Sequence, residues 1–208
     1  MNLSERLAAQ LASPHGWAGL LLGQAMDFAN RCPTRLALNL LQVRPGERIL
    51  DAGCGTGAAL ATLISRVDCD ACGVDASPTM VATARARLKG RARIEQDSIE
   101  NASFSSGSFD AALALNVLYF ADEHGCLVSA LRRLLKPGGR LVVYVTDRHT
   151  MTRWRFARVG RHRLFDTKEL VNALVAGGFE RAAISVFARS VAPGVRGLLA
   201  LATNGEVA

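Results

Sequence analysis

The chain has 208 residues, 50% of them hydrophobic and 21% charged, and a net charge of +7, a composition typical of one globular domain. No apolar run reaches the length of about 18 residues that a membrane span requires. The first residues lack the basic and apolar regions of a signal peptide, so a secreted protein is not expected either.

The five cysteines are odd in number and scattered, which argues against a disulfide framework and favours a reducing compartment. Cys69 and Cys72 form a C-x-x-C pair, but no second pair or histidine follows at the spacing of a zinc site. We therefore expect free thiols, no metal site and a cytoplasmic protein.

Two helices are predicted before the first strand, over residues 3–12 and 16–42. Leucines recur every four residues in the first, and Leu36, Leu40 and Leu41 form an apolar stripe in the second. Pro45-Gly46 then interrupts the chain.

Strands and helices alternate through the rest of the sequence. We predict strands over 47–52, 71–75, 93–95, 109–115 and 140–145, and helices over 57–66, 77–89, 122–135 and 166–176. The alternation predicts a doubly wound, mostly parallel α/β sheet. Two last strands, 179–188 and 195–203, are joined only by a short link around Pro193, which requires an antiparallel hairpin.

The most informative segment is Ile49–Gly57, where an apolar strand runs into Asp51 and then into Gly53, Gly55 and Gly57. Glycines at this spacing permit a sharp turn and a close approach of a ligand to the backbone. The helix that follows offers free N–H groups and the positive end of its dipole. This pattern predicts a ligand-binding turn at the carboxyl end of the first strand.

Two classes of ligand are compatible with this turn. Gly53, Gly55 and Ala58 satisfy the G-x-G-x-x-G/A pattern of dinucleotide-binding folds, with Asp75 at the expected distance for a ribose. Asp51 would repel a pyrophosphate, however, and suits a ligand that carries an ammonium and a sulfonium group. Asp97 follows the third strand, and the closing hairpin replaces a second nucleotide-binding half. These features favour S-adenosylmethionine.

Taken together, the motifs resemble those of class I S-adenosylmethionine-dependent methyltransferases. Ile49–Gly57 is similar to the first motif of that family, Gly73–Ser77 to the second and Gln96–Ser98 to the third. Ser108–Leu118 resembles the fourth, and Leu135–Arg140 resembles the turn before strand five. The resemblance implies a seven-stranded sheet in the order 3-2-1-4-5-7-6, with its last strand antiparallel, helices on both faces and an N-terminal helical lid.

The resemblance also implies one methyltransferase domain over residues 1–208. It comprises a lid (1–44), a cofactor-binding core (45–146), a basic insert on the substrate side (147–165), and a C-terminal helix with a β-hairpin (166–208).

The resemblance assigns cofactor contacts position by position. Asp51 would interact with the amino group of the cofactor, and Asp75 would accept both ribose hydroxyls. Asp97 would bind the adenine amino group, Met80 would flank the ring, and Asn116 would face the methionine end. The expected cofactor-binding residues are Asp51, Gly53, Cys54, Gly55, Gly57, Asp75, Ala76, Met80, Asp97, Ser98 and Asn116.

A catalytic base is not identified by the sequence, since a sulfonium is already a good leaving group and methyl transfer mainly requires alignment. Four side chains are candidates for a base or for orienting the acceptor: His149, Tyr119, His124 and His15. The run Asn116–Tyr119 differs from the Pro-Pro-aromatic run of enzymes that methylate amide or nucleobase nitrogens. This argues against adenine or glutamine as the acceptor.

The stretch from Arg148 to Arg163 holds six arginines and no acid. It could bind an anionic small molecule, nucleic acid or anionic lipid, or it could be a solvated basic loop. We favour a small-molecule acceptor, possibly anionic, over RNA or a phospholipid headgroup. A protein that binds S-adenosylmethionine without catalysis is a further alternative, and the oligomeric state stays open.

Overall fold

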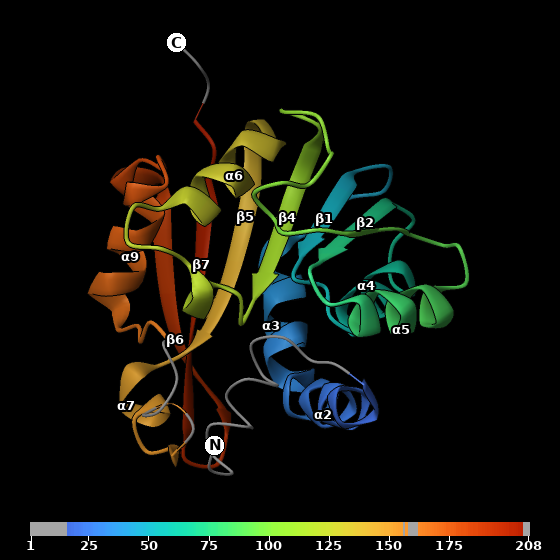
Figure 1. Ribbon diagram of the computed structural model, residues 1–208. Helices are drawn as coiled ribbons and strands as arrows, with labels where there is room; N and C mark the ends of the chain where they lie inside the picture. The colour runs from blue at the N-terminus through green and yellow to red at the C-terminus, as the bar shows by residue number, and fades with distance from the viewer. Residues whose placement is uncertain (1–15, 156, 158–161, 206–208) are drawn as a thin grey trace.

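The computed structural model describes residues 16–155, 157 and 162–205, and Figure 1 shows helices packed against one central sheet. Seven strands are hydrogen-bonded in the order β3-β2-β1-β4-β5-β7-β6. β1 to β5 pair in parallel, whereas β7 runs antiparallel to both β5 and β6. The predicted strand order and the antiparallel last strand are therefore confirmed. The strands are β1 (Arg48–Ala52), β2 (Asp70–Asp75), β3 (Arg93–Gln96), β4 (Phe109–Leu115), β5 (Leu135–Thr146), β6 (Ile184–Ala192) and β7 (Val195–Thr203).

Two buried apolar clusters pack the helices against the sheet. One contains Leu131 of α6 and Leu170 of α9, and the other contains Leu38 of α3 and Leu88 of α5. The α-helices are α2 (Gly16–Ala29), α3 (Arg31–Leu41), α4 (Ala58–Ile64), α5 (Pro78–Leu88), α6 (Cys126–Leu134), α7 (Arg148–Met151) and α9 (Thr167–Ala176), with 3-10 turns η1 (Leu118–Phe120) and η2 (Arg181–Ala183).

The predicted helix over 16–42 is two helices, α2 and α3, which meet at Asn30. Pro33 explains the break, because it has no N–H to donate to the carbonyl of Ala29 and its ring would collide with that carbonyl in a continuous helix. The predicted helix over 3–12 lies outside the described residues.

Several other predicted boundaries were wrong. The helix expected from residue 122 begins at Cys126, after a turn in which Gly125 has a φ of 81°. β5 begins at Leu135 rather than at residue 140, because Leu135 pairs with Phe109 before an irregularity in the ladder. β6 begins at Ile184 rather than at residue 179, because η2 intervenes.

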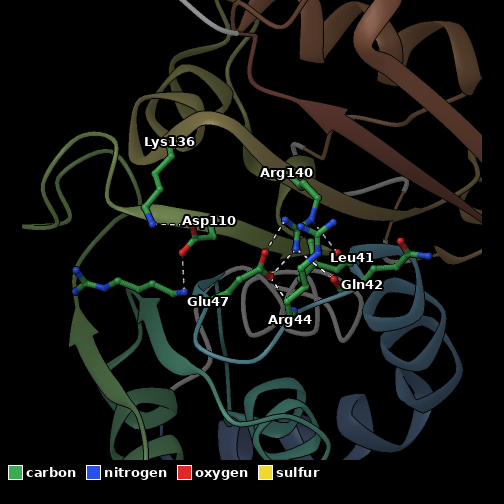
Figure 2. Close-up of polar contacts among 8 residues, drawn as sticks. Leu41, Gln42, Arg44, Glu47, Asp110, Lys136 and Arg140 are labelled. Carbon is green, nitrogen blue, oxygen red and sulfur yellow. Dashed lines mark hydrogen bonds and ion pairs between the residues drawn. The ribbon is translucent and has the colours of Figure 1, made fainter.

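A network of charged side chains fixes α3 and the amino ends of β1, β4 and β5, as Figure 2 shows. Arg140 donates to both oxygens of Glu47, at 3.0 and 2.7 Å, and to the carbonyl of Leu41 at 3.0 Å. Lys136 pairs with Asp110 at 2.6 Å. The hydrogen bond from Arg140 lowers the pKa of Glu47. These charges lie at the amino ends of the strands, away from the site described next.

Candidate functional site

A cavity of about 340 Å³ lies at the carboxyl ends of β1 to β4. The helices α2 and α3 contribute Met26, Asn30 and Thr34 to its wall, and Phe120 comes from η1. The structure brings together nearly all of the predicted cofactor-binding residues. Those that line the cavity are Asp51, Gly53, Cys54, Gly55, Asp75, Ala76, Met80, Asp97, Ser98 and Asn116.

Gly57 is the predicted residue that does not line the cavity. It caps α4 with a φ of 75°, and a β-carbon there would lie 3.1 Å from both Ala84 and Leu88 of α5. A glycine is therefore required at position 57 for the turn and for its close packing on α5, rather than for an approach to a ligand.

The glycine turn crosses from β1 to the end of β2 and is held there by hydrogen bonds. The N–H groups of Gly53 and Cys54 donate to the carbonyl of Val74, at 2.8 and 3.0 Å. The N–H of Gly55 donates to one oxygen of Asp75 at 2.8 Å, and that of Ser77 donates to the other at 2.8 Å. Each carboxylate oxygen keeps a free lone pair, so Asp75 can accept two further hydrogen bonds, such as those from a pair of vicinal hydroxyls.

Asp51 is buried at the end of β1, with 2% of its surface exposed. Its Oδ2 has no hydrogen-bond partner among the described residues. Burial, together with the nearby charge of Asp75, raises the pKa of Asp51 to about 7. An unpartnered carboxylate in a cavity wall is suited to receive a cation such as an ammonium group.

The described cavity wall is strongly acidic. It contains five carboxylate side chains and, within the described residues, no arginine, lysine or histidine. Such a wall disfavours a pyrophosphate and fits a cofactor that carries an ammonium and a sulfonium. The five acids are Asp27, Asp51, Asp75, Asp97 and Glu100.

Asp27 ties α2 to the glycine turn, a contact that sequence reasoning did not find. Its carboxylate accepts from the hydroxyl of Thr56 at 2.7 Å and pairs with Arg87 of α5 at 2.7 Å. Arg87 also donates to Thr56 at 2.7 Å. Gly23 packs so closely that an added β-carbon would lie 2.9 Å from Thr56 and 3.3 Å from Met80. No local pattern signals these contacts, because 29 residues separate Asp27 from Thr56 and 60 separate it from Arg87.

Asn116 follows β4 in a left-handed conformation, with a φ of 60°. Its Nδ2 donates to Asn30 at 3.1 Å, and its Oδ1 accepts from the hydroxyl of Tyr119 at 3.2 Å. The Tyr119 hydroxyl in turn accepts from the backbone N–H of Thr146 at 2.5 Å. Side-chain hydrogen bonds thus link the junction of α2 and α3 to the carboxyl ends of β4 and β5.

The three candidate bases within the described residues do not line the cavity. Tyr119 is buried beside it, and burial raises the pKa of its hydroxyl. His149, at the start of α7, and His124, before α6, are exposed and do not line the cavity. His15 lies outside the described residues.

The arginines of the basic stretch that are described do not line the cavity either. Arg148 pairs with Glu169 of α9. Arg163 donates to the carbonyl of Asp122 at 2.7 Å, and Arg153 to that of Gly194 at 3.5 Å. Arg155 is exposed. Arg158 and Arg161 lie outside the described residues.

Within the described ranges, no three His, Cys, Asp or Glu side chains gather where they could hold a metal ion. Of the C-x-x-C pair, Cys72 is buried in β2 and Cys69 is half-buried just before it. None of the helices in these ranges is long and apolar enough to cross a membrane.

Comparison with known proteins agrees with the geometry. A family model described as a methyltransferase domain matches residues 50–143. The ribosomal protein L11 methyltransferase of Thermus thermophilus is 33% identical in an alignment of 181 residues that covers 81% of this chain and 69% of that protein. The trans-aconitate 2-methyltransferase of Deinococcus radiodurans is 35% identical over 122 residues, 58% of this chain and 46% of that protein.

A solved structure shares the fold. The phosphoethanolamine N-methyltransferase 2 of Haemonchus contortus, in complex with S-adenosyl-L-methionine, superposes with a TM-score of 0.69 at 16% identity, over 96% of this chain and 56% of that one. The chain spans 35% to 58% of the length of several further curated relatives that it matches. It belongs to the class I S-adenosylmethionine-dependent methyltransferases, and S-adenosylmethionine is its cofactor.

Proposed function

We propose that the chain transfers a methyl group to a small-molecule acceptor by in-line displacement. The observation that carries this proposal is the acidic cavity at the carboxyl ends of β1 to β4, where ten of the eleven residues predicted to bind the cofactor converge. When bound, S-adenosylmethionine supplies a methyl group on a sulfonium and remains as S-adenosylhomocysteine after transfer.

In this proposal each cofactor-binding residue contacts the part of the cofactor that suits its side chain. Asp75, fixed by two backbone N–H groups, accepts the ribose hydroxyls. Asp51, which lines the cavity, receives the amino group. Asp97 accepts from the adenine amino group, and Met80, buried beneath Gly23 of α2, packs beside the ring.

We propose that α2 and α3 form the described part of the lid, within residues 1–44, over the core of residues 45–146. The acceptor would then enter between this lid and η1, against Met26, Phe120 and Leu127. These side chains are apolar, whereas Arg148, Arg153 and Arg163 bond to groups outside the cavity. The arrangement supports a compact, neutral acceptor better than an anionic one.

The chain's part in the reaction is alignment and the exclusion of water. Within the described residues no histidine lines the cavity, which supports a reaction that depends on positioning more than on a protein base. The curated relatives do not decide the acceptor, since the name of one specifies a ribosomal protein and that of the other specifies trans-aconitate.

Isothermal titration with S-adenosylhomocysteine tests the cofactor site. Asp75→Ala should abolish binding, whereas Asp70→Ala, which removes a carboxylate from the opposite end of the same strand, should leave it unchanged. Equal binding by wild type and Asp75→Ala would contradict the site.

Incubation with S-adenosylmethionine carrying a labelled methyl group, in a fractionated cell extract, tests the acceptor. Label in the small-molecule fraction supports the proposal. Label that appears only in RNA, protein or lipid would overturn the acceptor class, and no transferred label would overturn catalysis.

A further inference from the structure

The hydrogen bonds that join Thr146, Tyr119, Asn116 and Asn30 run in one direction in the structure. The backbone N–H of Thr146 can only donate, so the Tyr119 oxygen accepts from it. That hydroxyl keeps its proton, because burial raises its pKa, and donates it to Oδ1 of Asn116 at 3.2 Å. Asn116 therefore presents its carbonyl oxygen to Tyr119 and its amide nitrogen to Asn30.

This direction fixes the orientation of Asn30. Its side-chain oxygen accepts from Asn116, so its amide nitrogen is turned the other way, with two protons to donate. Asn30 also does not cap its own helix, since its side chain makes no hydrogen bond to the first turn of α3. No described residue accepts from this nitrogen, and Asn30 lines the cavity.

Thr34 lies one turn further along α3 and also lines the cavity. Its backbone N–H donates to the carbonyl of Asn30 at 2.8 Å, which places the two residues on the same face. The Thr34 hydroxyl makes no hydrogen bond to another described residue. Two neutral donor side chains with free protons therefore stand together at the junction of α2 and α3.

The charges of the cavity decide which group these donors meet. S-adenosylmethionine carries one anionic group, the carboxylate of its methionine part. At the ends of β1, β2 and β3 this carboxylate would face Asp51, Asp75 and Asp97. The end of β4 presents the neutral side chain of Asn116 instead. Asp27, the acid closest to Asn30 in sequence, is already paired with Arg87 at 2.7 Å.

We propose that Asn30 and Thr34 form the binding site for the carboxylate of the cofactor, oriented by the hydrogen bonds that begin at Thr146. The inference rests on the cofactor and is independent of the methyl acceptor. Neutral donors are suited to this position because they bind an anion without neutralising the negative charge of the acids that bind the ammonium group.

Two ligands test the proposal by titration calorimetry: S-adenosylhomocysteine and its decarboxylated analogue, which keeps the adenosine, the sulfur and the amino group. The wild type should bind S-adenosylhomocysteine about tenfold more tightly than the analogue, or better. In Asn30→Asp the side chain still accepts from Asn116 but offers the cavity a negative charge, so the preference should fall to about one or reverse. Thr34→Val should lower it about threefold.

Asn39→Asp is the matched control, since it adds the same charge to an exposed position of α3 and should leave the preference unchanged. Two outcomes would overturn the proposal: a wild type that does not distinguish the ligands, or an Asn30→Asp variant that weakens both by the same factor. If Asn30→Asp does not fold, an unchanged preference in Thr34→Val would overturn it. No acceptor is present, so an error in the acceptor class would not affect this result.

Discussion

The carboxylate of Asp27 and the hydroxyl of Thr56 lie 2.7 Å apart, which joins α2 directly to the glycine turn. Arg87 of α5 contacts both side chains, so three segments meet at one partly buried point. The backbone of the turn itself is anchored to the end of β2. The position of α2 beside the cavity is therefore set by charge as well as by apolar packing.

Removing either charge of the ion pair between Asp27 and Arg87 should weaken cofactor binding. In Asp27→Asn and Arg87→Met we expect S-adenosylhomocysteine to bind about three- to tenfold more weakly, because α2 is held less firmly over the cavity. Arg87 does not line the cavity, so its substitution separates the position of α2 from a direct contact. Asp70→Asn, which breaks the pair with Arg48, is the control. Unchanged titration curves for both variants would show that packing alone places α2.

Asp51 should make the unliganded protein less stable as the pH rises. Its pKa is about 7 in the folded protein and about 4 in an unfolded chain, so between these values the folded state binds the extra proton. The free energy of unfolding therefore falls as the pH rises from about 4 to about 7. Asp51→Asn should raise the free energy of unfolding by on the order of 2 kcal/mol at pH 8 and change it little at pH 4.

Urea denaturation of both proteins at the two pH values measures this difference. The same variant should bind S-adenosylhomocysteine more weakly, since its neutral amide no longer attracts the amino group. An equal stability difference at both pH values would contradict the raised pKa.

Gly53 and Gly55 both have positive φ values, of 71° and 52°, but differ in their surroundings. A β-carbon at Gly53 would lie 2.5 Å from a methyl group of Val117, whereas one at Gly55 would meet nothing within 4 Å. Gly53→Ala should therefore cost more than about 2 kcal/mol of stability, and Gly55→Ala only the backbone strain of about 1 kcal/mol.

Gly55 lines the cavity, so Gly55→Ala should impair S-adenosylhomocysteine binding more than it impairs folding. Thermal unfolding and titration calorimetry on both variants separate the two effects. Equal stability losses would argue against the contact between Gly53 and Val117.

Arg140→Met should destabilise the fold by about 2–3 kcal/mol without changing cofactor affinity. The substitution removes the donors to Glu47 and to the end of α3, and it leaves a carboxylate with only 14% of its side chain exposed without its ion pair (Figure 2). Arg140→Lys keeps the charge but not the forked geometry and should give an intermediate loss. Urea denaturation measures the loss, and a change in S-adenosylhomocysteine affinity would contradict the separation of this network from the site.

The strand order and the place of the glycine turn in the cavity wall were predictable because their signals are local. Asp51, Asp75 and Asp97 each stand at the carboxyl end of a predicted strand, and a parallel sheet brings such ends together. The alternation of strands and helices and the short link at Pro193 then determined the closing hairpin. Of the glycines in the turn, Gly57 shows the limit, because its packing on α5 is not a property of the motif.

The contacts that complete the site were not predictable, because they join residues far apart in sequence. Asn30 and Asn116 are 86 residues apart, and each is ordinary in its local context. The break between α2 and α3 depends on Pro33, which tolerates a position near a helix start as readily as it ends a helix. For these reasons, patterns in a single sequence predict the wall of the cavity formed by the strand ends. The wall formed by α2 and α3 becomes visible only in the tertiary structure.

Two acids of β1 and its flanks differ in whether they have an ion-pair partner. Glu47, before the strand, is neutralised by Arg140, whereas Asp51, four residues on, stays unpartnered in the cavity. The contacts that stabilise the scaffold thus lie at one end of the sheet, and the groups poised for ligands lie at the other. Such a division favours adaptability, because residues of the cavity wall such as Met26 and Phe120 can be exchanged without disturbing the charged network that holds the strands.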